Sequence, residues 1–199
     1  MASQPPEPTR RLFIAVMLPE QVQQDLAGLG RLLAAHRDVL RAVRPEALHF
    51  TLRFLGEQTA GNERLAAEAC AAAAGRSAAF PLVIGGFGAF PNARRPNVIW
   101  LGVLQGGEEL SMLARQVEDE LRSRRVVTES ERFTPHLTLA RVRPTATPAA
   151  RSALAATLPG LPVSEQARCV AGDITLVHST LTAQGSRYAV LGRWPLQPQ

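Results

Sequence analysis

The sequence contains no lysine, so all 22 of its basic side chains are arginines. Its 17 acidic residues leave a net charge of +5 at pH 7 over 199 residues. This mild positive excess favours polyanionic ligands over acidic proteins, and guanidinium groups form paired hydrogen bonds with phosphate oxygens. The charge alone is too small to identify a partner.

Other absences narrow the class of protein. Cys70 and Cys169 are the only cysteines and form no CxxC pair, so we expect free, buried thiols, not a disulfide or a metal site. No apolar run is long enough to span a bilayer, and the N-terminus lacks the apolar segment of a signal peptide. We therefore expect a cytoplasmic protein with no membrane partner. No glycine-rich phosphate loop of the GxGxxG or GxxxxGK[ST] type is present.

The order of elements predicts an α+β fold. Residues 1–10 hold three prolines and little that could pack, so we expect a disordered leader, followed by one domain over residues 11–196. Periodicity and turn residues predict strands at 12–17, 48–55 (closed by Gly56), 80–87, 97–104, 133–142, 167–181 and 187–193, and helices at 19–43, 62–76, 108–125 and 149–158. Without a run of βαβ units, this mixture does not favour a doubly wound parallel sheet.

Two similar tetrapeptides stand out, His49-Phe50-Thr51-Leu52 and His136-Leu137-Thr138-Leu139, each in an expected strand. Because side chains alternate along a strand, the histidine and threonine of each motif share one face, while the apolar residues point to the core. A third His-x-Thr begins at His178 and is interpreted as a surface or strand-end histidine. His36 is assigned no role.

Two imidazoles and two hydroxyls suit displacement at phosphorus. The entering and leaving oxygens stand on opposite sides of the phosphorus atom, so a general base and a general acid must flank it. Histidine titrates near neutrality, and threonine hydroxyls can donate to the non-bridging oxygens. No metal is required, and neither motif has HxH or HxxxH ligand spacing. Two half-buried strand histidines bonded to neighbouring threonines remain the structural alternative.

These residues resemble the 2H phosphoesterase superfamily, and most closely its RNA 2′,3′-cyclic phosphodiesterases, the LigT-like or 2′-5′ RNA ligase family. The resemblance covers nearly the whole chain in order and spacing, and its matching segments are residues 11–15, 48–56, 96–102, 133–141 and 179–196.

The resemblance implies a fold, a reaction and a partner. The fold would have two pseudo-symmetric lobes of antiparallel sheet backed by helices, with the motifs facing each other across a central groove. The enzyme would hydrolyse RNA 2′,3′-cyclic phosphate ends to 2′-phosphomonoesters without metal or other cofactor, and could also join RNA ends reversibly through a 2′-5′ linkage. The partner would be an RNA or nucleotide with such an end, and the protein would be a monomer.

The resemblance also assigns roles to the motif residues. His136 would be the proton acceptor that activates water, and His49 the proton donor to the departing 3′ oxygen. Thr51 and Thr138 would hold the phosphate.

Further substrate contacts are expected near the motifs. Arg141 stands where similar proteins have an arginine and is our first candidate for a phosphate contact, although strict alternation puts it opposite His136 unless the strand has a bulge. Arg53 has the right parity and is the second candidate. Phe90, Phe133 and Phe13 are candidates for base stacking, and Phe13 is favoured more as a core residue.

Two other functions remain open from the sequence. One is a phosphodiesterase for small cyclic nucleotides or other 2′-linked metabolites, which would use the same residues. The other is a non-catalytic module that binds RNA ends, against which the two intact motifs argue.

Overall fold

A computed structural model describes residues 7–29, 33, 36–128, 133–161, 165–182 and 185–198 of the chain. Within these ranges the strands are β1 (Arg10–Met17), β2 (Leu40–Ala42), β3 (His49–Gln58), β4 (Phe80–Phe90), β5 (Val98–Gln105), β6 (Leu137–Val142), β7 (Glu165–Ala171), β8 (Asp173–Thr182) and β9 (Gly185–Pro195). The helices are α1 (Glu20–Ala27), α3 (Ala60–Ala74), α4 (Gly107–Ser123) and α5 (Pro148–Thr157), with short 3-10 turns at Pro45–Ala47 and Leu158–Gly160.

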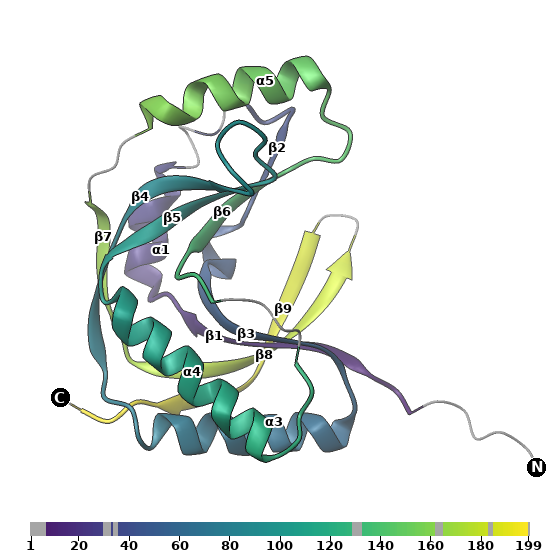
Figure 1. Cartoon of the computed structure of the whole chain (residues 1–199), viewed down its shortest axis with the longest axis vertical. Helices are drawn as coiled ribbons and strands as arrows, with labels where there is room; N and C mark the ends of the chain where they lie inside the picture. The colour runs from purple at the N-terminus through teal and green to yellow at the C-terminus, as the bar shows by residue number, and fades with distance from the viewer. Residues whose placement is uncertain are drawn as a thin grey trace, which may run out of the picture.

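The strands form one curled antiparallel sheet made of two halves. Its order is β7-β4-β5-β6-β3-β1-β8-β9, and β2 adds to β6. The halves meet where β6 runs beside β3 through a single residue pair, Phe50 with Leu137. Helices α3 and α4 pack together under the β3-β1-β8-β9 half, α1 contacts β7, and α5 lies at the opposite end of the molecule (Figure 1). The predicted α+β fold with two lobes is confirmed.

Local sequence explains where the helices begin. The hydroxyl oxygens of Thr59 and Thr147 accept backbone N–H bonds at the starts of α3 and α5, which satisfies donors that a helix leaves unpaired. Helix α4 starts after Gly106, whose φ of +88° is the left-handed conformation that glycine adopts without steric cost. A β carbon at Gly106 would stand 2.4 Å from the carbonyl oxygen of Pro81, so no larger residue fits.

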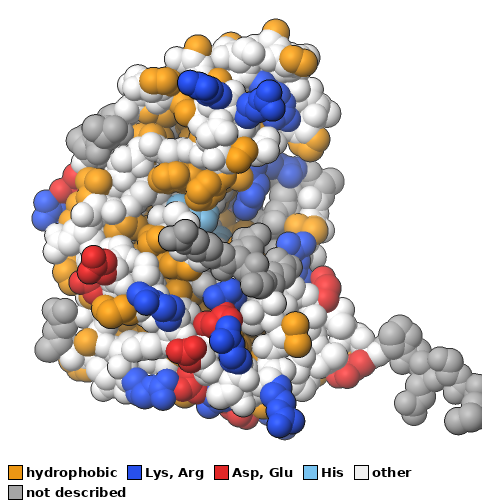
Figure 2. Space-filling model, viewed as in Figure 1, with side chains coloured by type: hydrophobic (Ala, Val, Ile, Leu, Met, Phe, Trp, Pro, Cys, Tyr) orange, Lys and Arg blue, Asp and Glu red, His pale blue; other side chains and the backbone are white. Residues whose placement is uncertain are grey.

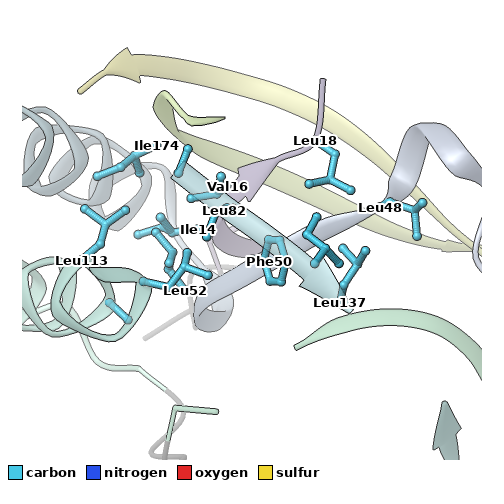
Figure 3. Close-up of a cluster of buried hydrophobic side chains, with 14 of the residues drawn as sticks. Ile14, Val16, Leu18, Leu48, Phe50, Leu52, Leu82, Leu113, Leu137 and Ile174 are labelled. Carbon is cyan, nitrogen blue, oxygen red and sulfur yellow. The ribbon is translucent and has the colours of Figure 1, made fainter. Parts of the chain in front are cut away.

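The main core lies between the sheet and its helices. Strand β1 is buried on both faces: Leu12, Ile14 and Val16 point into this core, whereas Phe13 and Ala15 join a smaller cluster on the other face. Figure 3 shows side chains from both halves meeting in the core, and the ten labelled there are Ile14, Val16, Leu18, Leu48, Phe50, Leu52, Leu82, Leu113, Leu137 and Ile174. The apolar residues of both motifs are thus buried in the main core, where they hold β3 and β6 in place.

The expected helix at 19–43 is wrong from His36 onward, whereas Leu29 and Leu33 are helical as expected. Helix α1 ends at Ala27, and Leu40–Ala42 forms strand β2 against β6. Residues 30–32, 34 and 35 of that prediction lie outside the described residues. The leucine spacing was misleading because Leu40 is buried in either conformation, here with the backbone extended beside Val142.

Other boundaries also differ from the predictions. The expected strand at 167–181 is two strands separated by Gly172, and Gly56 lies inside β3 with a φ of +69° instead of ending it. Strand β6 begins at Leu137, so His136 precedes it. The expected leader is ordered at its end, since the Thr9 hydroxyl donates to Glu57 and β1 starts at Arg10. Residues 1–6 lie outside the described part of the chain.

Both cysteines are free, as expected. Burial raises the pKa of the Cys70 thiol to about 12 and that of Cys169 to about 11, so neither supplies a thiolate near neutral pH. Among the described residues, no helix has the length and apolar character needed to cross a membrane.

Candidate active site

The two motifs line one cavity where the halves of the sheet meet. Its volume is about 390 Å³, and its polar or aromatic lining residues are Arg11, Phe13, Arg41, His49, Thr51, Phe54, His136, Thr138, Arg141, Ser179, Ser186 and Tyr188. Figure 2 shows a pale blue histidine surface in a hollow near the middle of this face. We call this space the central cavity. Among the described residues that line it, three are arginines and none is a carboxylate.

Both imidazoles are oriented by the same type of hydrogen bond. Nδ1 of His49 lies 2.7 Å from the carbonyl oxygen of Ala47, and Nδ1 of His136 lies 2.7 Å from that of Thr134. A carbonyl oxygen only accepts, so each Nδ1 carries a proton and donates it. The proton exchanged with a ligand must therefore be held at Nε2 of each ring.

Each imidazole also packs against two aromatic rings. Phe13 lies 4.8 Å from His49, and Tyr188 meets the same ring edge-on at 5.4 Å between centroids. On the other side, Phe90 meets His136 edge-on at 4.8 Å, with Trp100 at 6.3 Å. Such contacts restrict ring rotation, so the two histidines are held in fixed orientations.

A glycine makes room for one of these aromatic rings. The indole of Trp100 lies over Gly88, where an added β carbon would stand 2.2 Å from the ring. The ring could not reach its place beside His136 over any larger residue at that position.

A β-bulge after the first motif turns Arg53 away from the cavity. Ile14 pairs with Arg53 and the next residue of β1, Ala15, pairs with Thr51, so Leu52 is an extra residue in β3. The bulge reverses the alternation of side chains beyond it. Phe54 consequently lines the cavity, while Arg53 forms an ion pair with Glu118 of α4 on the other face. Because of this bulge, Arg53 does not line the central cavity, although its parity in the sequence predicts that it would.

A bulge at the corresponding place after the second motif turns Arg141 toward the cavity. Ile99 pairs with Ala140 and the following Trp100 pairs with Thr138, which leaves Leu139 as the extra residue of β6. Arg141 therefore lines the central cavity together with Thr138, despite its unfavourable parity in the sequence. Arg141 and Phe54 occupy equivalent places, each five residues after its histidine.

The chain's relationship to known proteins is visible in its sequence. The profile of the 2′-5′ RNA ligase superfamily matches residues 18–180. The chain belongs to this superfamily. It is 37% identical over 161 residues to a protein of Aeropyrum pernix named RNA 2′,3′-cyclic phosphodiesterase, covering 79% of this chain and 87% of that one. A protein of the same name from Methanothermobacter thermautotrophicus is 32% identical over 89% of this chain and 94% of its own.

Solved structures give the same relationship. The crystal structure of Escherichia coli LigT complexed with 3′-AMP is similar with a TM-score of 0.72 and 26% identity, covering 94% of this chain and 98% of that one. The protein TT0787 of Thermus thermophilus is similar with a TM-score of 0.75 and 28% identity, covering 95% and 99%. The 2′-5′ RNA ligase superfamily fold therefore extends over nearly the whole chain.

Burial sets the charge state of one histidine in this superfamily member. Burial, together with the positive charges of Arg141 and His136, lowers the pKa of His49 from an ordinary value of 6.5 to about 4. The hydrogen bond to Ala47 acts in the opposite direction. In the absence of ligand, the His49 imidazole is neutral at pH 7.

We expect this pKa to make stability depend on pH. Between about pH 4 and 6.5 the unfolded chain binds a proton at His49 that the folded chain does not, so stability is full above 6.5 and falls toward pH 4, by up to about 3 kcal/mol. Urea unfolding across this range should give a shallower pH slope for His49→Gln than for the wild type. His178→Gln, whose ring lies outside the central cavity, is the control and should keep the wild-type slope. Equal slopes for wild type and His49→Gln would contradict the burial effect.

The three phenylalanines expected to stack on bases lie in different environments. Phe13 is 2% exposed and packs on His49 and Tyr188, so it has the core role that the sequence favoured. Phe90 is half-buried with its ring against His136 and Trp100, and Phe133 packs against the main core. Of the three, Phe13 lines the central cavity, whereas Phe90 and Phe133 do not.

Several cavity residues were not identified from the sequence. Tyr188 is the only tyrosine of the chain, which was a usable signal. Arg41 was assigned to a helix, and Arg11 was noted only as part of a matching segment. Ser179 and Ser186 are small polar residues of strands, without any pattern that marks them.

His178 and His36 lie outside the central cavity. His178 lines a separate shallow cavity with Thr9, Arg10 and Glu57. The ring of His36 lies 3.3 Å from the Thr157 hydroxyl. Across the residues that the structure describes, no three His, Cys, Asp or Glu side chains gather as a metal site would need.

Proposed function

We propose that this protein is an RNA 2′,3′-cyclic phosphodiesterase that hydrolyses cyclic phosphate ends to 2′-phosphomonoesters. The observation that carries this proposal is the pair of imidazoles, each with Nδ1 bonded to a carbonyl oxygen, in one cavity with two threonines and Arg141. Several relatives carry the name of this activity.

The reaction follows from two imidazoles that present Nε2. Nε2 of His136 accepts a proton from water as the water oxygen attacks phosphorus. The bond between phosphorus and the 3′ oxygen breaks on the opposite side, and Nε2–H of His49 gives its proton to that oxygen. One P–O bond forms and one breaks, and the product keeps its phosphate on the 2′ oxygen.

His49 must gain a proton before it can act as the acid. It is neutral in the empty cavity because burial lowers its pKa. The negative charge of a bound cyclic phosphate favours the imidazolium, and the Nδ1–H bond to Ala47 favours it as well. Substrate binding therefore supplies the condition for protonation of His49.

The remaining polar groups would stabilise the charge on phosphate. The hydroxyls of Thr51 and Thr138 can donate to the non-bridging oxygens, and Arg141 adds a charged donor. Among the described lining residues, no carboxylate competes with the phosphate for these donors.

The same displacement can proceed with a different nucleophile. If the 5′ hydroxyl of a second strand replaces water, loss of the 3′ oxygen leaves a 2′-5′ linkage. The ligation that the resemblance implies would therefore use His136 and His49 in unchanged roles.

The test is product analysis in EDTA with a nucleoside 2′,3′-cyclic phosphate and with a short RNA that carries the same end. A 2′-phosphate product from either supports the proposal, and the ratio of the two rates indicates whether a nucleotide or an RNA is preferred. A 3′-phosphate product would contradict the leaving group, and no product from folded protein would favour a binding module.

A further inference from the structure

A second, smaller cavity adjoins the central cavity beside strand β2. Its volume is about 110 Å³, and the residues that line both cavities are Arg41, Val43, Ala47, Arg141, Ser186 and Tyr188. Arg44 and Gly185 line the small cavity but not the central one. Pockets that enclose whole small molecules are typically about 300 Å³ or more. The small cavity is therefore suited to one compact group of a ligand that also occupies the central cavity.

Positive charge is concentrated where the two cavities meet. Arg41 of β2 and Arg141 of β6 are direct partners in the antiparallel register, so both side chains leave the same face of the sheet. Like charges in directly opposed positions repel each other. Within the described part of the chain, no acidic residue lines either cavity. An anion at this junction would be attracted by both guanidinium groups.

The guanidinium group of Arg41 lies beside Gly185 of β9. The guanidinium carbon of Arg41 lies 3.9 Å from the position that a β carbon on Gly185 would take, and Gly185 lines the small cavity only. His49 and His136 line the central cavity only. The guanidinium of Arg41 therefore lies next to a part of the small cavity that neither catalytic histidine lines.

A cyclic phosphate bound between the histidines carries one negative charge and would occupy Arg141. The charge of Arg41 then lies where another anionic group of the same substrate can contact it. In an RNA 3′ end, the nearest such group is the phosphate on the 5′ side of the terminal ribose. Arginine suits this partner because its guanidinium binds two phosphate oxygens at once.

We propose that Arg41, in the small cavity, binds this second phosphate and so makes the enzyme prefer ends that carry it. The inference rests on the proposed function and names the substrate feature that the site selects. The second phosphate occurs as the internucleotide diester of an RNA strand and as the 5′-phosphate of a mononucleotide. Both present the same oxygens to Arg41.

The test compares four substrates that differ only at this group: adenosine 2′,3′-cyclic phosphate, the same nucleotide with a 5′-phosphate, a diadenylate with a cyclic end, and that diadenylate with a neutral methylphosphonate linkage. Each is assayed with the wild type, Arg41→Gln and Arg187→Gln. Arg187 of β9 lies between Ser186 and Tyr188 in sequence but lines neither cavity. Its variant has the same change of charge as Arg41→Gln and is the matched control.

In the wild type and in Arg187→Gln, we expect the second phosphate to raise kcat/KM by about tenfold or more, as charged hydrogen bonds do. In Arg41→Gln this ratio should fall to less than about threefold, and its dependence on salt should weaken. A gain for both phosphorylated substrates supports recognition of the phosphate itself, and a gain for the diester alone identifies the RNA strand as its source.

Three results would overturn the inference: equal rates for the methylphosphonate and the diester, a ratio that Arg41→Gln leaves unchanged, or the same loss in Arg187→Gln. If the wild type hydrolyses none of the substrates, the proposed function fails instead. In that case, calorimetry of the two diadenylates tests the inference separately from catalysis. If wild type and Arg41→Gln show the same difference in affinity between the diester and the methylphosphonate, the inference is overturned.

Discussion

Replacing either His49 or His136 by alanine is expected to lower kcat for a 2′,3′-cyclic phosphate by roughly 10²- to 10⁴-fold, the usual contribution of a general acid or base. Each imidazole is held by a hydrogen bond through Nδ1 and by two aromatic rings. No third imidazole lines the central cavity to replace a lost Nε2. Because the acid and the base act in the same transition state, the double variant should lose little more than either single one. Steady-state assays of purified variants measure these losses.

The third His-x-Thr sequence offers a matched control. His178→Ala removes an imidazole from the same type of motif, but one that lines a different cavity, and it should keep wild-type kcat. Circular dichroism should show that all the variants remain folded. If His49→Ala or His136→Ala kept more than about a tenth of the wild-type kcat, the acid and base assignment would be wrong.

Strand alternation was enough to predict which residues of each motif face the core and which face away from it. Phe50, Leu52, Leu137 and Leu139 are apolar at alternate positions, and all four are buried. Such alternation places the intervening polar side chains on the opposite face, which is where the central cavity lies. That these two strands are neighbours followed from the resemblance and not from the pattern, since no local signal encodes strand order.

Which of Arg53 and Arg141 lines the central cavity was not predictable from strand alternation in the sequence. A bulge is defined by the pairing of a strand with its neighbour. The sequence of β6 alone therefore does not indicate that Leu139 is an extra residue in its pairing with β5. Strict alternation of side chains predicts that Arg53 shares the face of His49 and that Arg141 lies on the face opposite His136. The two bulges reverse both placements. The resemblance ranked Arg141 first because it carried information on the register.

Strand β2 was missed for a different reason. It has only three residues. A segment this short does not contain enough residues to show whether its apolar positions repeat as in a helix or as in a strand. Its pairing with β6 is a long-range contact that brings Arg41 opposite Arg141. The smaller cavity, with its concentration of positive charge, could therefore be recognised only from the structure.

The bulges lead to opposite expectations for Arg141 and Arg53. Arg141→Gln should lower kcat/KM by about 10²- to 10³-fold, the cost of removing one donor to the transition-state charge, with little change in stability because its side chain is exposed. Arg53→Gln should leave kcat/KM within about threefold of the wild type, since Arg53 does not line the central cavity. The Arg53→Gln substitution should instead lower the free energy of unfolding.

The expected stability loss for Arg53→Gln follows from its ion pair. The side chains of Arg53 and Glu118 are only 12% and 19% exposed, and removal of one partner leaves a charge that is largely shielded from water. We expect a loss of about 2 kcal/mol, below the range for fully buried pairs. Urea unfolding and steady-state kinetics on both variants measure the two effects. If Arg53→Gln lowered kcat/KM as much as Arg141→Gln did while remaining as stable as the wild type, the side chain of Arg53 would have to face the phosphate. Such a result would mean that β3 has no bulge at Leu52 in solution.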